Sequence, residues 1–272
     1  MEAFDHRRGL YPLALSVAIA NWRVLALAAL ILAANRLGAV VVQMELPADS
    51  PEAFAAWGFE VLVDLLVATA VDFTIVPCLL SLGALRGWAA LSRARAGPIG
   101  LYIGLSLLFG LMLLVPVVLF GILALAFVSP EENAVAYVAV LGIAVLIVLL
   151  LLTALIGLAF PDVIASGRLS LGRAWGWGRA HFGRLNYLLW TGVAPVTLLV
   201  LYLDDVFDTD VTTGEAQIPE ALGLGVVVDA GLVGLVGVAA TVLTTTALCK
   251  VYYVVAPPDE QLQNERVAEV FD

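Results

Sequence analysis

The sequence predicts an all-α, polytopic membrane protein: a bundle of six transmembrane helices with an inner-surface connector helix between spans 4 and 5. Hydrophobic residues make up 62% of the 272 positions and charged residues only 13%, whereas charged residues account for about a quarter of a soluble protein. Mean hydropathy is +1.03. In addition, basic and acidic residues are segregated into alternating polar segments between long apolar runs.

The N-terminal region contains a short apolar segment and then the first span. Residues 10–20 are apolar and are followed by Trp22 and Arg23, so we expect an elbow helix on the inner membrane surface that leads into the span. The span itself covers Val24–Val42. It resembles a signal peptide with a cleavage site near residue 33, but the apolar run continues well beyond that point, which favours a retained anchor.

Five further apolar runs follow, and most of them exceed the roughly 20 residues that cross about 30 Å of hydrocarbon. These runs are Gly58–Leu85, Pro98–Val128, Ala134–Phe160, Tyr187–Leu203 and Ala221–Cys249. Their excess length predicts tilted or bent helices. The last run has small residues on one helical stripe, which would let a neighbouring backbone approach closely: Gly231, Gly234, Gly237 and Thr241.

The basic residues predict the orientation of the chain. Three precede the first span, three lie between the second and third spans, four are in the central connector and two are at the C-terminal end. The loops on the opposite face contain eleven acidic residues and no basic one. Because cytoplasmic loops are enriched in basic residues, we expect both termini in the cytoplasm. The spans form one domain, residues 1–256, and residues 257–272 form a polar, acidic cytoplasmic tail.

The central connector, Pro161–Asn186, is a polar segment between spans and holds four arginines and two tryptophans. On a helix, its apolar side chains gather on one side and several basic side chains on the other. This pattern is typical of a helix that lies on a membrane surface. The residues that we expect to contact the inner leaflet are Arg168, Arg173, Trp175, Arg179, Phe182 and Arg184.

Four ionisable residues lie well inside the apolar runs, and Glu60 lies near the outer edge of the second run: the four are Arg36, Asp64, Asp72 and Asp229. Each would cost about 2.5 to 3.5 kcal/mol at the bilayer centre, so each needs a partner or water. Counting helical rise from the outer span ends puts Arg36 and Asp64 at similar depths, which predicts an ion pair, with Asp229 as a candidate third member. Two interpretations stay open: a structural ion pair with protonated aspartates, or a translocation or ligand site.

The sequence shows no catalytic, metal or nucleotide motif, so we expect neither enzymatic activity nor a cofactor. Cys78 and Cys249 lack zinc or redox spacing and are expected to be packing residues. The two histidines, His6 and His181, stand 175 residues apart in polar segments. A nucleophile with a base, or an HExxH-type metal pair, is not present, which makes an intramembrane enzyme the weakest interpretation.

The region Leu155–Leu189 resembles the signature region of a prokaryotic six-helix membrane-domain family. In that family, found fused to some glycerophosphodiester phosphodiesterases and in stand-alone proteins of unknown function, a span ends in a Val/Ile segment and a small-residue turn, followed by a basic surface helix. The matching residues are Val163, Ile164, Gly167, Ser170 and Ala174, and Pro116 matches a proline late in the third span. The resemblance implies a non-catalytic membrane domain, because the soluble phosphodiesterase domain and its metal-site pattern are not present here.

These observations predict a non-catalytic protein of a prokaryotic cytoplasmic membrane. A single lysine beside twelve arginines, with a pI near 4.6, is typical of a high-GC or salt-adapted microbe. The expected function is a scaffold or accessory domain for a partner protein or a lipid-related enzyme, and the expected partners are membrane lipids and a protein, not nucleic acid. The alternative is a small permease for protons, ions or a small solute that uses the intramembrane acids.

Overall fold

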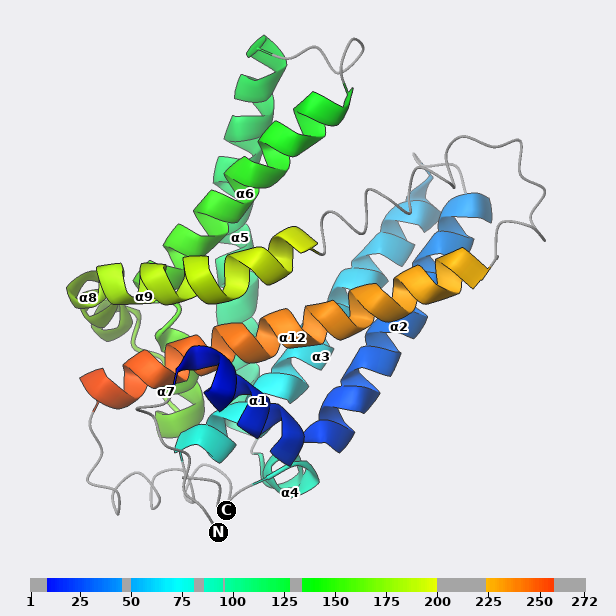
Figure 1. The fold of residues 1–272 in the computed structure, drawn as a ribbon. Helices are drawn as coiled ribbons and strands as arrows, with labels where there is room; N and C mark the ends of the chain where they lie inside the picture. The colour runs from blue at the N-terminus through cyan, green and yellow to red at the C-terminus, as the bar shows by residue number, and fades with distance from the viewer. Residues whose placement is uncertain are drawn as a thin grey trace. The chain divides into compact units, whose positions relative to one another are not determined.

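The fold is entirely helical over the residues that the structure describes. A computed structural model describes residues 9–45, 50–80, 86–94, 96–127, 134–199 and 224–256, and every regular element in these ranges is a helix (Figure 1). Within these ranges, four helices are long and apolar enough to cross a membrane: Trp22–Val42, Pro51–Leu80, Ala96–Phe120 and Val226–Val255. A bent pair, Val140–Ile156 with Ala159–Ser166, provides a fifth candidate. The predicted all-α fold is therefore confirmed for the described residues, which contain four to five candidate membrane spans.

The chain forms two compact units. The first contains Met1–Ala94 and Pro195–Thr246, and the second contains Arg95–Ala194 and Ala247–Asp272. The last long helix, α12 (Leu224–Val255), belongs to both, since the boundary falls inside it. The predicted acidic tail, 257–272, lies outside the described residues, as does the end of the predicted fifth span beyond residue 199.

The first unit opens with the elbow helix predicted from the sequence. Its elements are α1 (Leu10–Ala20), α2 (Trp22–Glu45), α3 (Pro51–Leu80), α4 (Trp88–Arg93) and the greater part of α12. The bounds of α1 coincide with those of the predicted elbow. Proline at position 12 falls in the first turn of α1, where the backbone N–H has no intrahelical acceptor in any case. Leu13 and Val17, which lie one turn apart on the inner side of this helix, are completely buried.

Asn21 joins the elbow to the far end of α3. Its side chain is almost fully buried and donates from Nδ2 to the Val17 carbonyl oxygen at 2.8 Å and to Cys78 Sγ at 3.5 Å. Its Oδ1 accepts from the backbone N–H of Gly87 at 2.7 Å. Gly87 has φ +52°, a left-handed conformation that favours glycine. Cys78 is thus a buried packing residue, as predicted, and it forms no disulfide.

The small-residue stripe of α12 packs against α2. A Cβ atom on Gly234 would lie 2.6 Å from the carbonyl oxygen of Ala29, and one on Gly237 would lie 3.7 Å from the Leu32 side chain. A Cβ on Gly231 would meet nothing within 4 Å. Close backbone approach is therefore confirmed at Gly234, whereas Gly231 faces open space.

The second unit contains the bent helix pair and the connector. Its elements are α5 (Ala96–Phe127), α6 (Ala134–Ile156), α7 (Ala159–Ser166), α8 (Leu171–Ala180), α9 (Phe182–Leu188), the π-helical segment η1 (Leu189–Val193) and the end of α12. Residues 194–199 continue the helix after η1. The connector is thus helical on both sides of His181, which interrupts the helix between α8 and α9.

The predicted fourth span, Ala134–Phe160, is bent, in line with the tilt or bend expected from its excess length. Helix α6 ends at Ile156, and α7 starts three residues later at an angle of 41°. Gly157 lies at the break, where a Cβ atom would come within 2.9 Å of the Leu248 side chain. Pro161 falls in the first turn of α7, where its missing N–H costs nothing. The first residues of the predicted connector therefore form a buried helix rather than a surface segment.

Candidate functional site

The most strongly buried charge contact in the described residues centres on Asp162, in the first turn of α7. Only 2% of this residue is exposed. An ionised carboxylate at such a depth is very costly unless it is paired and hydrogen-bonded. The neighbours of Asp162 therefore decide what the site can do.

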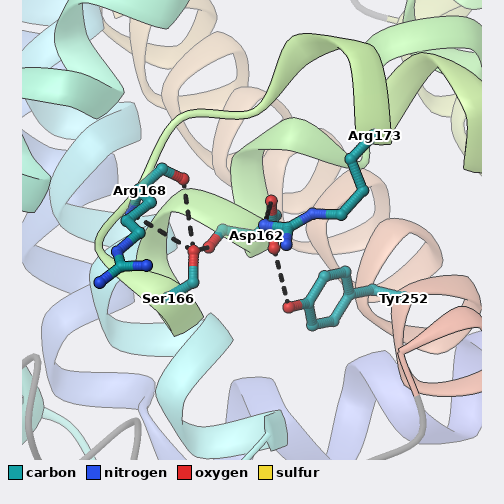
Figure 2. A network of polar contacts seen from close by, with 5 residues as sticks. All are labelled: Asp162, Ser166, Arg168, Arg173 and Tyr252. Carbon is teal, nitrogen blue, oxygen red and sulfur yellow. Dashed lines mark hydrogen bonds and ion pairs between the residues drawn. The ribbon is translucent and has the colours of Figure 1, made fainter.

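Each carboxylate oxygen of Asp162 has a partner from a different helix (Figure 2). The Nη2 atom of Arg173, on α8, lies 2.6 Å from Oδ2. The hydroxyl group of Tyr252, near the end of α12, donates to Oδ1 at 3.1 Å. The carboxylate thus ties α7, α8 and α12 together, all within the second unit.

Trp177 closes this network through its ring. It lies one turn after Arg173 on α8, and the guanidinium carbon of Arg173 is 5.2 Å from the ring centroid. Its ring also meets that of Tyr252 edge to face, with centroids 5.8 Å apart and an interplanar angle of 80°. Cation–π and edge-to-face contacts of this kind each contribute roughly 0.5 to 1.5 kcal/mol. We call Asp162, Arg173, Trp177 and Tyr252 the α7 clamp.

A tight turn brings α8 back to Asp162. Gly167 ends α7 with φ +64° and donates its N–H to the Val163 carbonyl oxygen at 2.9 Å. The Ser166 hydroxyl donates to the backbone oxygen of Asp162 at 2.7 Å and accepts from the N–H of Arg168 at 3.3 Å. These bonds are local, so they fix the turn independently of the clamp. Figure 2 shows the turn beside the carboxylate.

On the other face of α8, the helix backbone packs directly against the backbone of α6. Ala174 and Gly178 are buried, and a Cβ atom on Gly178 would overlap the carbonyl oxygen of Leu155. Only glycine allows the two backbones to come this close. The clamp residues on α8 are therefore held by backbone contact on one side and by Asp162 on the other.

The predicted inner-leaflet residues divide into two groups. Arg173 turns inward to Asp162, although 44% of its side chain remains exposed. Arg168, Arg179 and Arg184 are exposed, Trp175 is 43% exposed and Phe182 is half-buried. One predicted lipid-contacting arginine is therefore committed to a protein contact, while the remaining basic side chains stay accessible.

The predicted intramembrane charges all belong to the first unit. On α2 and α3, Arg36 Nη1 lies 4.0 Å from Glu60 Oε1. Asn35 Nδ2 donates to Asp64 Oδ1 at 2.9 Å and to the backbone oxygen of Glu60 at 3.1 Å. Asp64 also lies within electrostatic range of Arg36. Arg36 thus forms its ion pair with Glu60. The depth argument had predicted Asp64, which lies one helical turn further along α3.

The deeper acids, Asp72 and Asp229, are both 8% exposed. The Thr245 hydroxyl, on α12, donates to Asp72 Oδ1, so this carboxylate links α3 to α12. Thr245 had no part in the sequence prediction. A threonine in an apolar run is too common to point to one particular aspartate.

Sequence reasoning missed Asp162 and Tyr252 as site residues. A signal for Asp162 was available, because it is the only acidic residue in a connector with four arginines. Tyr252 carried no comparable signal, since it lies at the end of an apolar run near a predicted membrane interface, where tyrosines are common.

Metal chemistry has no ready donor set in this part of the chain: the described residues contain no group of three or more His, Cys, Asp or Glu side chains placed to hold an ion. The clamp itself consists of a carboxylate, a guanidinium, an indole and a phenol engaged with one another. Comparisons of the chain with protein-family models, with curated proteins and with solved structures found no match.

Proposed function

We propose that this chain is a non-catalytic, multi-pass protein of a prokaryotic cytoplasmic membrane that acts as a scaffold or accessory domain for a partner protein or a lipid-related enzyme. The observation that carries the proposal is the way Asp162 is used. Both carboxylate oxygens of Asp162 bind side chains of the same protein. The residue therefore connects helices rather than acting as a reactive group. Asn21 acts in the same way.

The proposed topology has six spans with both termini in the cytoplasm. Five candidates come from the helices described above, and we assign the sixth to Tyr187–Leu203, of which the part up to residue 199 is helical. The distribution of basic residues supports the orientation. In this topology α8 and α9 lie at the inner membrane surface.

The accessible arginines of the connector then meet the headgroups of the inner leaflet. Each of Arg168, Arg179 and Arg184 would contribute up to about 1 kcal/mol near anionic lipid. Replacing all three by glutamine should speed cleavage of the connector in vesicles that contain anionic lipid, with no change in neutral vesicles. The protease must be one that does not cleave after arginine, because the replacements themselves remove trypsin sites. Equal proteolysis of the variant and the unmodified protein in both vesicle types would contradict this contact.

A permease is the second candidate, and the buried Asp72 favours it. A carboxylate within a span that is linked to a hydroxyl group on a second helix is the kind of group that carries protons or binds a cation in transporters. The same contact also serves the scaffold model as a helix tie. The two models differ in whether Asp72 must change its protonation state or its partner.

Flux measurements separate the two functions. The purified protein is reconstituted into sealed liposomes that contain a pH-sensitive dye, and an ion or pH gradient is applied. A scaffold gives the leak rate of empty liposomes, both as the unmodified protein and as Asp72→Asn. A flux that the unmodified protein supports and Asp72→Asn abolishes would overturn the scaffold proposal and favour the permease.

Crosslinking in native membranes tests directly whether the proposed scaffold has a protein partner. A photoreactive side chain is placed at single lipid-exposed positions around the protein, for example at Leu30 on α2 and at Ile143 on α6. A scaffold should give one crosslinked partner, recovered in stoichiometric amount from adjacent positions on one face only. Lipid adducts alone from every position would contradict it.

A further inference from the structure

A groove of about 800 Å³ runs along the first unit between α1, the start of α2 and α12. This volume is in the range of about 300 to 1,000 Å³ that is typical of small-molecule sites. None of the residues that line the groove carries a charged side chain, and they include Leu15, Ala18, Trp22, Val238, Ala239 and Val242. The groove therefore suits a hydrocarbon chain.

A cation lies beside this apolar groove. The guanidinium carbon of Arg23 is 5.6 Å from the centroid of the Trp22 ring, and Trp22 itself lines the groove. Arg23 and Trp22 are both exposed. Helix α1 contains no charged residue, and neither does α12 from residue 230 to residue 249. Among the described residues of α1, of the first turns of α2 and of this part of α12, Arg23 is therefore the charged one.

We propose that the groove binds an anionic phospholipid, with an acyl chain between α1 and α12 and the phosphate at Arg23. Arginine forms strong, charge-assisted hydrogen bonds to phosphate, and tryptophan is enriched where headgroups meet hydrocarbon. The combination of an uncharged groove and the Arg23 cation beside it, as seen in the described residues, matches an amphiphile with a negative head.

The headgroup part of the proposal is tested with two lipids that share their acyl chains. The full-length protein in mild detergent is titrated with phosphatidylglycerol or phosphatidylcholine, and bound lipids are counted by native mass spectrometry. We expect about fivefold tighter binding of one phosphatidylglycerol, the effect of one basic residue near an anionic lipid. Arg23→Gln should reduce phosphatidylglycerol binding to the level of phosphatidylcholine, and Arg23→Lys should restore the preference.

The groove part of the proposal is tested by filling it. Ala239→Trp places an indole between α1 and α12 and should remove the bound lipid, whichever headgroup it has. Ala34→Trp is the matched control, because Ala34 is exposed on α2 and is not among the lining residues; it should bind lipid like the unmodified protein. An unchanged thermal unfolding midpoint in Arg23→Gln shows that the loss of preference is not unfolding.

Three results would overturn the inference. One is equal binding of the two lipids by the unmodified protein. Another is undiminished lipid binding by Ala239→Trp. The third is a dimer of the unmodified protein that Ala239→Trp dissociates, which would assign the groove to a second copy of the chain.

Discussion

The hydroxyl group of Tyr252 donates a 3.1 Å hydrogen bond to Asp162, a residue 90 positions earlier in the chain. The bond connects the end of α12 to the first turn of α7, and Arg173 takes the other oxygen of the same carboxylate. Since Asp162 is only 2% exposed, these two contacts stand in for the water that an ionised carboxylate would otherwise require. The stability of the second unit should therefore respond sharply to each of them.

The stability losses from removing the two partners of the ion pair should not add. Arg173→Leu leaves a carboxylate buried without its cation, which typically costs about 3 to 5 kcal/mol, and Asp162→Leu should cost a similar amount. The double replacement should cost clearly less than the sum of the two. Thermal unfolding in detergent measures all three variants, with Arg179→Leu as an exposed control of small effect. Strictly additive losses would show that Asp162 and Arg173 are not coupled.

Tyr252→Phe should have an intermediate effect. The change removes one hydrogen bond to a charged acceptor, worth about 1.5 to 3 kcal/mol, but it keeps the aromatic ring that meets Trp177. Tyr187→Phe is the matched control, because Tyr187 is 66% exposed, and it should leave the unfolding midpoint unchanged. If both variants unfold at the same temperature, the hydroxyl group of Tyr252 does not contribute.

Two glycines in α8, two positions apart, should respond to alanine in opposite directions. Gly178→Ala drives a methyl group into the backbone of α6 at Leu155, an overpacking that typically costs about 1 to 3 kcal/mol. Gly176→Ala meets nothing within 4 Å and should stabilise the helix by about 0.5 to 1 kcal/mol. The unfolding midpoints of the two variants should therefore lie on either side of that of the unmodified protein. A stable Gly178→Ala protein would contradict the close approach of α8 to α6.

The proposed orientation predicts which positions an impermeant thiol reagent can reach in intact cells. Single cysteines at Ser50 and Thr212, in the loops without basic residues, should react, whereas one at Ser92 should not. The native cysteines at 78 and 249 are buried, so the unmodified protein provides the background. Labelling at position 92 alone would reverse the orientation.

The charges on α2 and α3 should be coupled through Glu60. Arg36→Leu and Glu60→Leu should show a non-additive loss of stability, because Arg36 Nη1 lies 4.0 Å from Glu60 Oε1. The coupling of Arg36 to Asp64 should be weaker, since the direct hydrogen bond of Asp64 comes from Asn35. The midpoints of the single and double variants measure both couplings. A stronger coupling to Asp64 would restore the pairing expected from span depth.

Much of the architecture could be predicted because it depends on local composition. The elbow helix followed from an apolar run of eleven residues that ends before Trp22 and Arg23, and α1 has those bounds. The break at Gly157 could not be predicted in the same way. It lies inside an apolar run, and a Cβ atom there would come within 2.9 Å of the side chain of Leu248, a residue 91 positions later. Hydropathy records that both segments are apolar but not that they meet.

The candidate site was harder to predict for a related reason. The depth argument chose the correct pair of helices for Arg36, but helical rise does not decide between Glu60 and Asp64, which differ by one turn, because a long arginine side chain can reach either. For the α7 clamp, Asp162 was conspicuous as the lone acid of the connector. Its hydrogen bond with Tyr252 depends on the packing of the end of α12 beside α7. No local sequence pattern encodes that packing.

The contacts of Asn21 also bear on the order in which the chain assembles. Its amide oxygen accepts from Gly87, 66 positions later, and its amide nitrogen reaches Cys78, 57 positions later. At a synthesis rate of about 5 to 20 residues per second, the ribosome needs roughly 3 to 13 s to add those 66 residues. Until Cys78 and Gly87 have been added, these two buried bonds of Asn21 have no partner to meet. Docking of the elbow through Asn21 is thus delayed until the second apolar segment and the turn at Gly87 have been synthesised.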